Sequence, residues 1–92
     1  MVFNKIDVKS IVKEERRDRE FDLEYRKIRQ EYKLIEKFVE TRKEKNITQK
    51  ELAEITGISQ QAISRLELER HIPKMDTFIK LLDGLDLELT IV

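Results

Sequence analysis

The chain has 92 residues, of which 39% are hydrophobic and 41% are charged, with two glycines, one proline and no cysteine. A chain of this length forms one small domain, and the scarcity of Gly and Pro favours helices over tight turns. Nineteen Lys and Arg balance nineteen Asp and Glu. No uniform charge therefore attracts the whole molecule to a polyanion, and the absence of cysteine excludes disulfides and thiolate metal sites.

Membrane and catalytic functions are also disfavoured. No stretch approaches the roughly 20 apolar residues that a membrane helix needs, and the N-terminus lacks the apolar core of a signal peptide. We therefore expect a cytoplasmic protein that makes no membrane contact. A phosphate-binding Gly loop is missing, and His71 is the only histidine, so an enzyme, a metal site and a cofactor are not expected. For His71 we expect a turn-stabilising or solvent-exposed role.

Residues 1–30 form a charged arm that we expect to be helical, since the chain from Ser10 to Asn46 contains neither Gly nor Pro. Apolar residues then recur at alternating spacings of four and three, which lines one side of a helix; they are Phe21, Tyr25, Ile28, Tyr32, Ile35 and Val39. Leu34 and Phe38 widen this stripe. Packing into a core is therefore expected to begin near Tyr32.

The earlier half of the stripe has two interpretations. It is either an exposed extension of the core helix or a docking surface for another protein. Aromatic side chains commonly carry interface energy, so we take the partner-binding residues to be Phe21, Tyr25 and Ile28.

Three shorter helices follow in residues 31–84, the second expected domain. Thr48 and Glu51 have the spacing of a capping box, and Gly57 can adopt the positive φ that ends a helix. Ser59 is the N-cap expected for the next helix, which runs to about Glu69. A last helix follows Pro73, carries Met75, Phe78, Leu81 and Leu82 on its apolar face, and is expected to be closed by Gly84.

Residues 85–92 change period, because apolar and polar residues alternate as in a strand with one covered face. A lone strand needs a hydrogen-bonding partner, and no other segment is predicted to be a strand. Pairing with the same strand of a second copy, or with the sheet edge of a partner, is therefore favoured over an in-chain edge strand or a frayed end. The expected dimerisation residues are Leu85, Leu87, Leu89 and Ile91.

Two short helices joined at a glycine are typical of a helix-turn-helix, in which the second helix enters the DNA major groove. Ala62, Ile63 and Leu66 are expected to point inward, which leaves the other side of that helix for solvent or DNA. Glutamine matches the donor and acceptor pair of adenine, and arginine matches the acceptor pair of guanine. We therefore assign base reading to Gln60, Gln61 and Arg65.

Neighbouring polar and basic residues are placed to meet phosphates, which would set position rather than sequence preference. Those around the first two short helices are Arg42, Lys43, Lys45, Gln49, Ser59 and Ser64, and those beyond the reading helix are Arg70 and Lys74. For Arg42, Lys43 and Lys45 the simpler interpretation is a solvated helix end.

The segment "TQKELAEITGISQQAISRLE", Thr48 to Glu67, resembles the helix-turn-helix of the Xre family, which includes the lambdoid phage repressors and Cro. The resemblance implies an all-α bundle of four to five helices, here with an N-terminal helical arm and a short C-terminal β-strand. It also implies DNA contact at Gln49, Gln60, Gln61 and Arg65. Where the family often has Asn-Gly after the reading helix, this chain has Leu68-Glu69.

The whole layout is similar to the HigA-type antitoxins, which have a charged N-terminal helix, DNA-binding helices and a short C-terminal strand. The resemblance implies a prokaryotic antitoxin that neutralises a small basic ribonuclease toxin of the RelE/HigB type. It also implies a homodimer that binds double-stranded operator DNA and represses its own operon. The alternatives are a stand-alone Xre-family regulator and an interaction module that no longer binds DNA.

Overall fold

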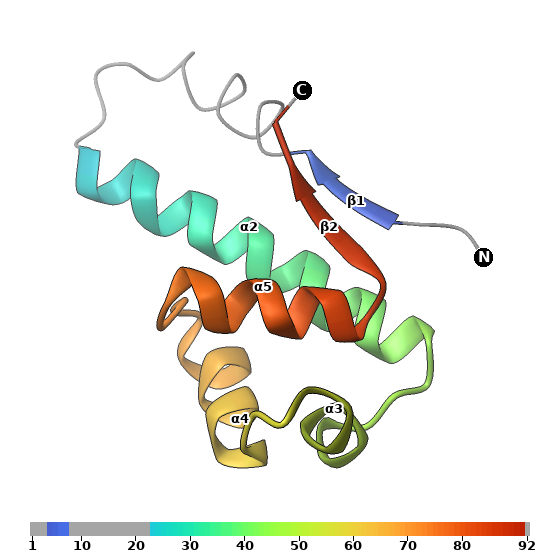
Figure 1. Ribbon diagram of the computed structural model, residues 1–92. Coiled ribbons are helices and arrows are strands. Elements are labelled where there is room, and N and C mark those ends of the chain that lie inside the picture. The colour runs from blue at the N-terminus through green and yellow to red at the C-terminus, as the bar shows by residue number, and fades with distance from the viewer. Residues whose placement is uncertain (1–3, 8–22, 92) are drawn as a thin grey trace.

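The computed structural model describes residues 4–7 and 23–91 (Figure 1). Its elements in chain order are β1 (Asn4–Asp7), α2 (Leu23–Glu44), α3 (Gln49–Thr56), α4 (Gln60–Glu69), α5 (Met75–Gly84) and β2 (Leu87–Thr90). The predicted helical bundle with a short C-terminal strand is confirmed. Phe21 and most of the predicted arm lie outside the described residues.

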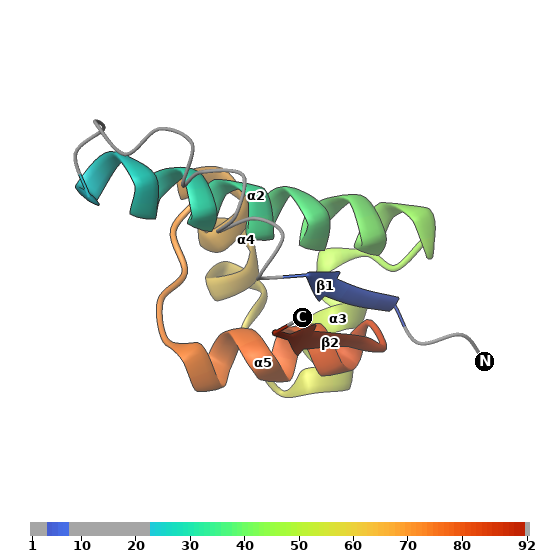
Figure 2. The ribbon, with the colours of Figure 1, turned by 90° about the horizontal axis from the view of Figure 1, so that it is seen from above.

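The helices form a compact bundle in which α3 and α4 lie together at one end (Figures 1 and 2). Only the C-terminal half of α2 is buried, and its first fully covered side chain is Ile35. Tyr32 is still 45% exposed, but Leu34 packs against the core, so core packing begins close to the expected position. Tyr25 and Ile28 are 45% and 55% exposed. This exposure is compatible with both interpretations of the stripe.

Asn46 ends α2 in a way that satisfies the last carbonyl groups of the helix. It has a positive φ of 56°. Its N–H donates to the Lys43 carbonyl, and the Ile47 N–H donates to the Arg42 carbonyl, at 3.0 and 3.1 Å. These two hydrogen bonds define a Schellman motif with asparagine at the left-handed position. The motif turns the chain directly into α3.

The core is formed by side chains from α2, α3, α4, α5 and the chain that follows α5. Phe38 and Phe78 form its aromatic centre, with ring centroids 6.2 Å apart and planes tilted by 54°, a favourable arrangement for aromatic pairs. The remaining buried hydrophobic residues are Ile35, Leu52, Ile63, Leu66, Leu81, Leu82, Leu85 and Leu87.

Gly84 is the last residue of α5, as predicted, and the structure also gives it a packing role that was not predicted. The left-handed residue after α5 is Asp86, with φ 57°. A Cβ added to Gly84 would lie 2.6 Å from Thr56 Cγ2 and 3.0 Å from Leu52 Cδ1. Glycine is therefore needed here because α3 and α5 approach closely.

β2 has a partner within the chain, which corrects the expectation of a lone strand. It pairs in parallel with β1, with Leu87 opposite Asn4 and Thr90 opposite Asp7. The strand at Asn4–Asp7 was not predicted. Leu85 and Leu87 are buried in the core of their own chain, so these two predicted dimerisation residues are not free for a second copy. Leu89 is partly buried and Ile91 is exposed.

Candidate nucleic-acid interface

A capping box fixes the start of α3. The Thr48 hydroxyl accepts the Glu51 N–H, and the Glu51 carboxylate accepts the Thr48 N–H, both at 3.0 Å. The hydrogen bond from the Thr48 backbone, followed by that involving its side chain, lowers the pKa of Glu51 below its usual value. Because the charged carboxylate is the better acceptor, this cap is most stable in neutral solution.

The turn between α3 and α4 has the predicted chemistry. Gly57 has φ 76° and donates its N–H to the Ala53 carbonyl at 2.9 Å. Two residues later, the Ser59 hydroxyl accepts the Ala62 N–H at 3.1 Å and caps α4. The predicted limits of both helices are confirmed. This turn directs one side of α4 inward and leaves its opposite side at the surface.

The outer side of α4 carries the three residues assigned to base reading. Gln60, Gln61 and Arg65 are all exposed, while Ile63 and Leu66 are buried on the opposite side. A shallow hollow at this surface joins the start of α3 to α4, and it is lined by Gln49, Gln60, Gln61, Ser64, Arg65, Leu68 and Glu69. The two helices therefore present their amide, hydroxyl and guanidinium groups together.

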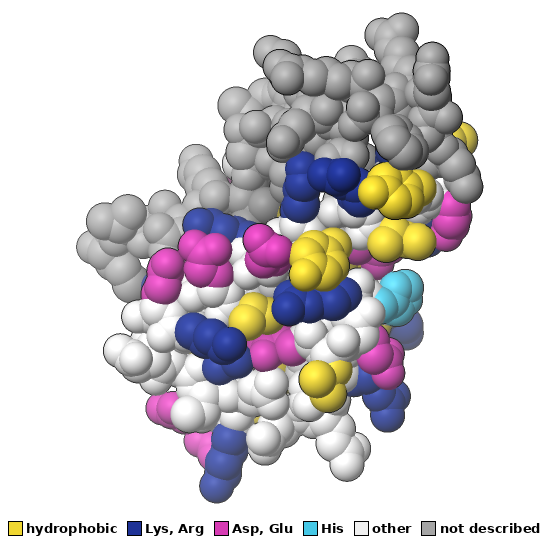
Figure 3. All heavy atoms as spheres, turned by 180° about the vertical axis from the view of Figure 1, so that it is seen from behind, with side chains coloured by type: hydrophobic (Ala, Val, Ile, Leu, Met, Phe, Trp, Pro, Cys, Tyr) yellow, Lys and Arg dark blue, Asp and Glu magenta, His cyan; other side chains and the backbone are white. Residues whose placement is uncertain are grey.

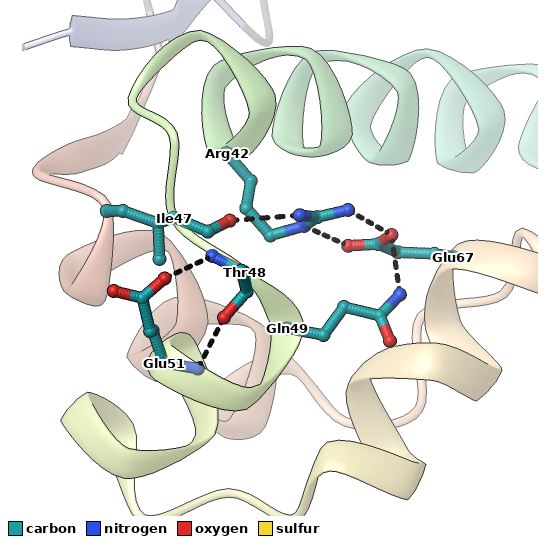
Figure 4. A network of polar contacts seen from close by, with 6 residues as sticks. All are labelled: Arg42, Ile47, Thr48, Gln49, Glu51 and Glu67. Carbon is teal, nitrogen blue, oxygen red and sulfur yellow. Dashed lines mark hydrogen bonds and ion pairs between the residues drawn. The ribbon is translucent and has the colours of Figure 1, made fainter.

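Glu67 connects this surface to α2 (Figure 4). Its carboxylate accepts hydrogen bonds from Arg42 Nε at 2.7 Å and Arg42 Nη2 at 2.9 Å. It also accepts one from Gln49 Nε2 at 2.9 Å. Arg42 Nη1 donates to the Ile47 carbonyl at 2.9 Å. The side chains of Arg42 and Glu67 are both about nine-tenths buried, so a single buried carboxylate ties α2, α3 and α4 together.

This network corrects the interpretation of Arg42, which was expected either to contact phosphate or to lie at a solvated helix end. Its guanidinium is used within the fold and is not free at the surface. The ion pair has two consequences for the interface. It neutralises Glu67, whose charge would otherwise repel phosphates, and it leaves Glu67 to orient the amide of Gln49 at the edge of the hollow.

The other predicted phosphate-contacting residues differ in their surroundings. Lys43 and Lys74 are exposed. Lys45 lies 3.6 Å from Asp86 in a partly exposed ion pair. Arg70 is the left-handed residue that ends α4, with φ 56°, and its Cζ lies 5.0 Å from the centroid of the Tyr32 ring. A phosphate contact by Arg70 therefore has to compete with this cation–π interaction.

Glu31 of α2 holds the connection between α4 and α5. Its Oε2 accepts the Ile72 N–H at 3.1 Å and lies 3.2 Å from His71 Nδ1. The sequence prediction of a turn-stabilising or exposed role for His71 fits this position, since the imidazole is exposed. Glu31 itself was not predicted, because its partner lies 41 residues further along the chain.

Charges of both signs are interspersed at the surface. On the face seen in Figure 3, Lys and Arg side chains lie among Asp and Glu side chains and do not form one continuous basic patch. This distribution agrees with the equal numbers of basic and acidic residues in the chain. A face of this kind provides no strong positive field to attract a polyanion.

Three residues of the interface were missed by the sequence interpretation. Glu67 follows the buried Leu66 in a run of alternating leucine and glutamate, where local periodicity does not distinguish a buried carboxylate from a solvated one. Leu68 is 80% exposed and lines the hollow together with Glu69. The extent of the helix could have revealed both, because α4 continues past the predicted reading residues to Glu69.

Residues 40–92 match the family model described as helix-turn-helix. The chain belongs to this Xre-type helix-turn-helix family. The match covers more than half of the chain and includes α3, the turn and α4. In this family α4 is the recognition helix, and its outer side is the one that faces DNA. The hollow lined by Gln49, Gln60, Gln61 and Arg65 lies on this outer side of α4.

A relative from Haemophilus influenzae is named an uncharacterized HTH-type transcriptional regulator. It is 36% identical over 59 residues, which cover 64% of this chain and 60% of the relative. The match thus spans less than two thirds of the relative's length. No solved structure matches. Within the described part of the helix-turn-helix protein, no helix is long and apolar enough to span a membrane.

Proposed function

We propose that this helix-turn-helix protein is a transcription regulator that recognises a specific double-stranded DNA sequence through the outer side of α4. The observation that carries the proposal is the exposure of Gln60, Gln61 and Arg65 beside Gln49, on helices whose opposite sides are locked into the core. The family and the printed name of the Haemophilus influenzae relative support it.

Base reading and phosphate contact predict different mutational patterns. A DNA sequence selected from a random library serves as the binding site, and its affinity is measured by fluorescence anisotropy. Gln60→Ala and Arg65→Ala are each expected to lose about 1–3 kcal/mol at one base pair, or roughly 5- to 150-fold in affinity. Each variant should then bind several bases at that position about equally well.

Lys43→Ala provides the contrasting variant, because an exposed lysine at the end of α2 can reach phosphate but carries no base preference. It is expected to weaken binding to all sequences alike. The slope of the logarithm of the affinity against the logarithm of the salt concentration should become shallower by about one. Glu36→Ala, on an exposed part of α2, is the control that should change neither property. Equal binding of selected and random DNA by the unmodified protein would rule out a sequence-specific regulator.

As a finer statement of this function, we propose that the chain is an antitoxin that neutralises a small basic ribonuclease toxin and represses its own operon. The support is the resemblance of the layout to HigA-type antitoxins, together with the exposed apolar residues of the first turns of α2. Leu23, Tyr25 and Ile28 are all exposed there, as a partner-binding surface requires. Phe21 completes the predicted set.

Coexpression with the neighbouring open reading frame tests this role. A small basic protein is expected to copurify and to lose its toxicity in the presence of the chain. The paired substitutions Tyr25→Ala and Ile28→Ala should restore toxicity and leave DNA binding unchanged, whereas Gln60→Ala should do the opposite. If no neighbouring product is toxic or copurifies, the chain acts as a stand-alone regulator.

A further inference from the structure

Leu68 is a hydrophobic residue in a surface that is otherwise polar. The hollow along α4 is lined by Gln49, Gln60, Gln61, Ser64, Arg65, Leu68 and Glu69, and Leu68 is the only hydrophobic side chain among them. It is 80% exposed, whereas Leu66, two residues earlier in the same helix, is 2% exposed. Leu68 therefore contributes little to the core, and its side chain is available for contact with a ligand at this surface.

The helix places Leu68 in line with residues assigned to base reading. α4 continues to Glu69, so Leu68 still has a helical position. Residues three, four and seven positions apart share one side of an α-helix, and Leu68 therefore follows Gln61 and Arg65 along the same side. With a rise of about 1.5 Å per residue, it lies about 10.5 Å beyond Gln61 along the helix axis. Base pairs are spaced about 3.4 Å apart, so this separation spans about three base pairs.

The chemistry of a leucine side chain restricts what it can recognise. Leu68 has no atom that donates or accepts a hydrogen bond, so a phosphate oxygen or the polar edge of a base is not a suitable partner. In the major groove, thymine presents an apolar group, its C5-methyl. Cytosine and uracil lack this methyl group. An apolar side chain on the base-reading side of the helix therefore favours thymine.

We propose that Leu68 is a specificity-determining residue that packs against the methyl group of a thymine, about three base pairs from the pair contacted by Gln61. The inference rests on the proposed function, because it requires the outer side of α4 to lie in the major groove. It adds one apolar contact to the hydrogen bonds assigned to Gln60, Gln61 and Arg65. Burial of one methyl group corresponds to about a fourfold change in affinity.

Replacement of single thymines by deoxyuridine tests the contact, since uracil differs from thymine only in lacking the methyl group. The DNA is the site that the unmodified full-length protein selects from a random library, and affinities are measured by fluorescence anisotropy. The base pair at which Gln61→Ala loses its preference marks the reference position. Deoxyuridine about three base pairs away is expected to weaken binding about fourfold. 5-Methylcytosine at the same position should be bound more tightly than cytosine.

Leu68→Ala should remove these differences. The variant is expected to bind the thymine site about fourfold more weakly than the unmodified protein does, and to bind the thymine and uracil sites equally well. Because the side chain is 80% exposed, the circular dichroism signal and the urea midpoint should not change. Met75→Ala is the matched control. It removes another large apolar side chain, 59% exposed, that does not line the hollow, and it should keep the fourfold preference for thymine.

Failure of this inference and failure of the proposed function give different results. If the unmodified protein selects no DNA sequence over random DNA, both fail. If a site is selected and Gln61→Ala relaxes one base pair, but no thymine at the expected distance is preferred over uracil, only the contact by Leu68 is refuted. Equal losses for Leu68→Ala on the thymine and uracil sites would also refute it, since they would indicate packing against deoxyribose.

Discussion

The buried ion pair between Arg42 and Glu67 predicts a large loss of stability when either partner is removed alone. Arg42→Met keeps most of the apolar stem of the side chain but removes the two hydrogen bonds that the guanidinium donates to Glu67. It leaves a carboxylate that is about nine-tenths buried and that still accepts a hydrogen bond from Gln49 Nε2. Breaking such a pair costs about 3–5 kcal/mol, because an uncompensated charge stays buried.

That loss is large for a domain of this size. A stability of about 0.05–0.15 kcal/mol per residue gives this chain about 5–14 kcal/mol in total. Equilibrium unfolding in urea, followed by circular dichroism, measures the change as a lower midpoint concentration with an unchanged slope. Arg42→Met is therefore expected to shift the transition far toward low urea.

Replacing both partners separates the charge effect from packing. In Arg42→Met combined with Glu67→Met no buried charge remains, so the double variant should regain at least half of the lost stability. It should still bind DNA less well, since the Gln49 amide has lost the carboxylate that orients it. A stability loss below about 1 kcal/mol for Arg42→Met would refute this reasoning. So would a double variant that loses more stability than the two single variants lose together.

Three further predictions concern the turns and caps. Gly84→Ala is expected to cost about 1–3 kcal/mol of stability through overpacking, since its Cβ would lie 2.6 Å from Thr56 Cγ2. Adding Thr56→Ser removes that methyl group and should recover part of the loss, measured by urea unfolding. No recovery would contradict the proposed contact. Gly57→Ala has open space around its Cβ but a φ of 76°, so about 1 kcal/mol of backbone strain is expected and Thr56→Ser should give no rescue. The lowered pKa of Glu51 adds stability that is present above the pKa of the unfolded chain and is lost as the pH falls through the folded pKa. Glu51→Gln can keep the cap hydrogen bond, so it should flatten the acid limb of stability against pH, and an unchanged limb would count against the cap.

Much of the candidate site was predictable because its signals are local. The capping pair Thr48 and Glu51, the positive φ of Gly57 and the cap at Ser59 each act within about one helical turn. They set where α3 and α4 begin and end. Once those limits are known, the 3.6-residue period assigns Gln60, Gln61 and Arg65 to the side opposite the core.

Predictions failed where a residue's role depends on a distant partner. Arg42 has the appearance of a solvated helix end until Glu67, 25 residues away, is placed beside it. The end of α5 at Gly84 was predicted correctly, but its close contact with α3 was not. Asn4–Asp7 carries too few residues for a recognisable strand period, and its pairing with Leu87–Thr90 joins the two ends of the chain.

The amino-acid sequence alone thus determined the helices, their caps, the outward side of α4 and the family, because these follow from interactions between near neighbours in the chain. Only the tertiary structure decided that Arg42 is buried with Glu67, that Gly84 is a packing contact and that β2 has a partner in its own chain. The physical reason is that burial and strand pairing are properties of segments brought together by the whole fold. The free energies of burial and strand pairing depend on the distances between segments that are far apart in the chain, and local sequence patterns do not specify these distances.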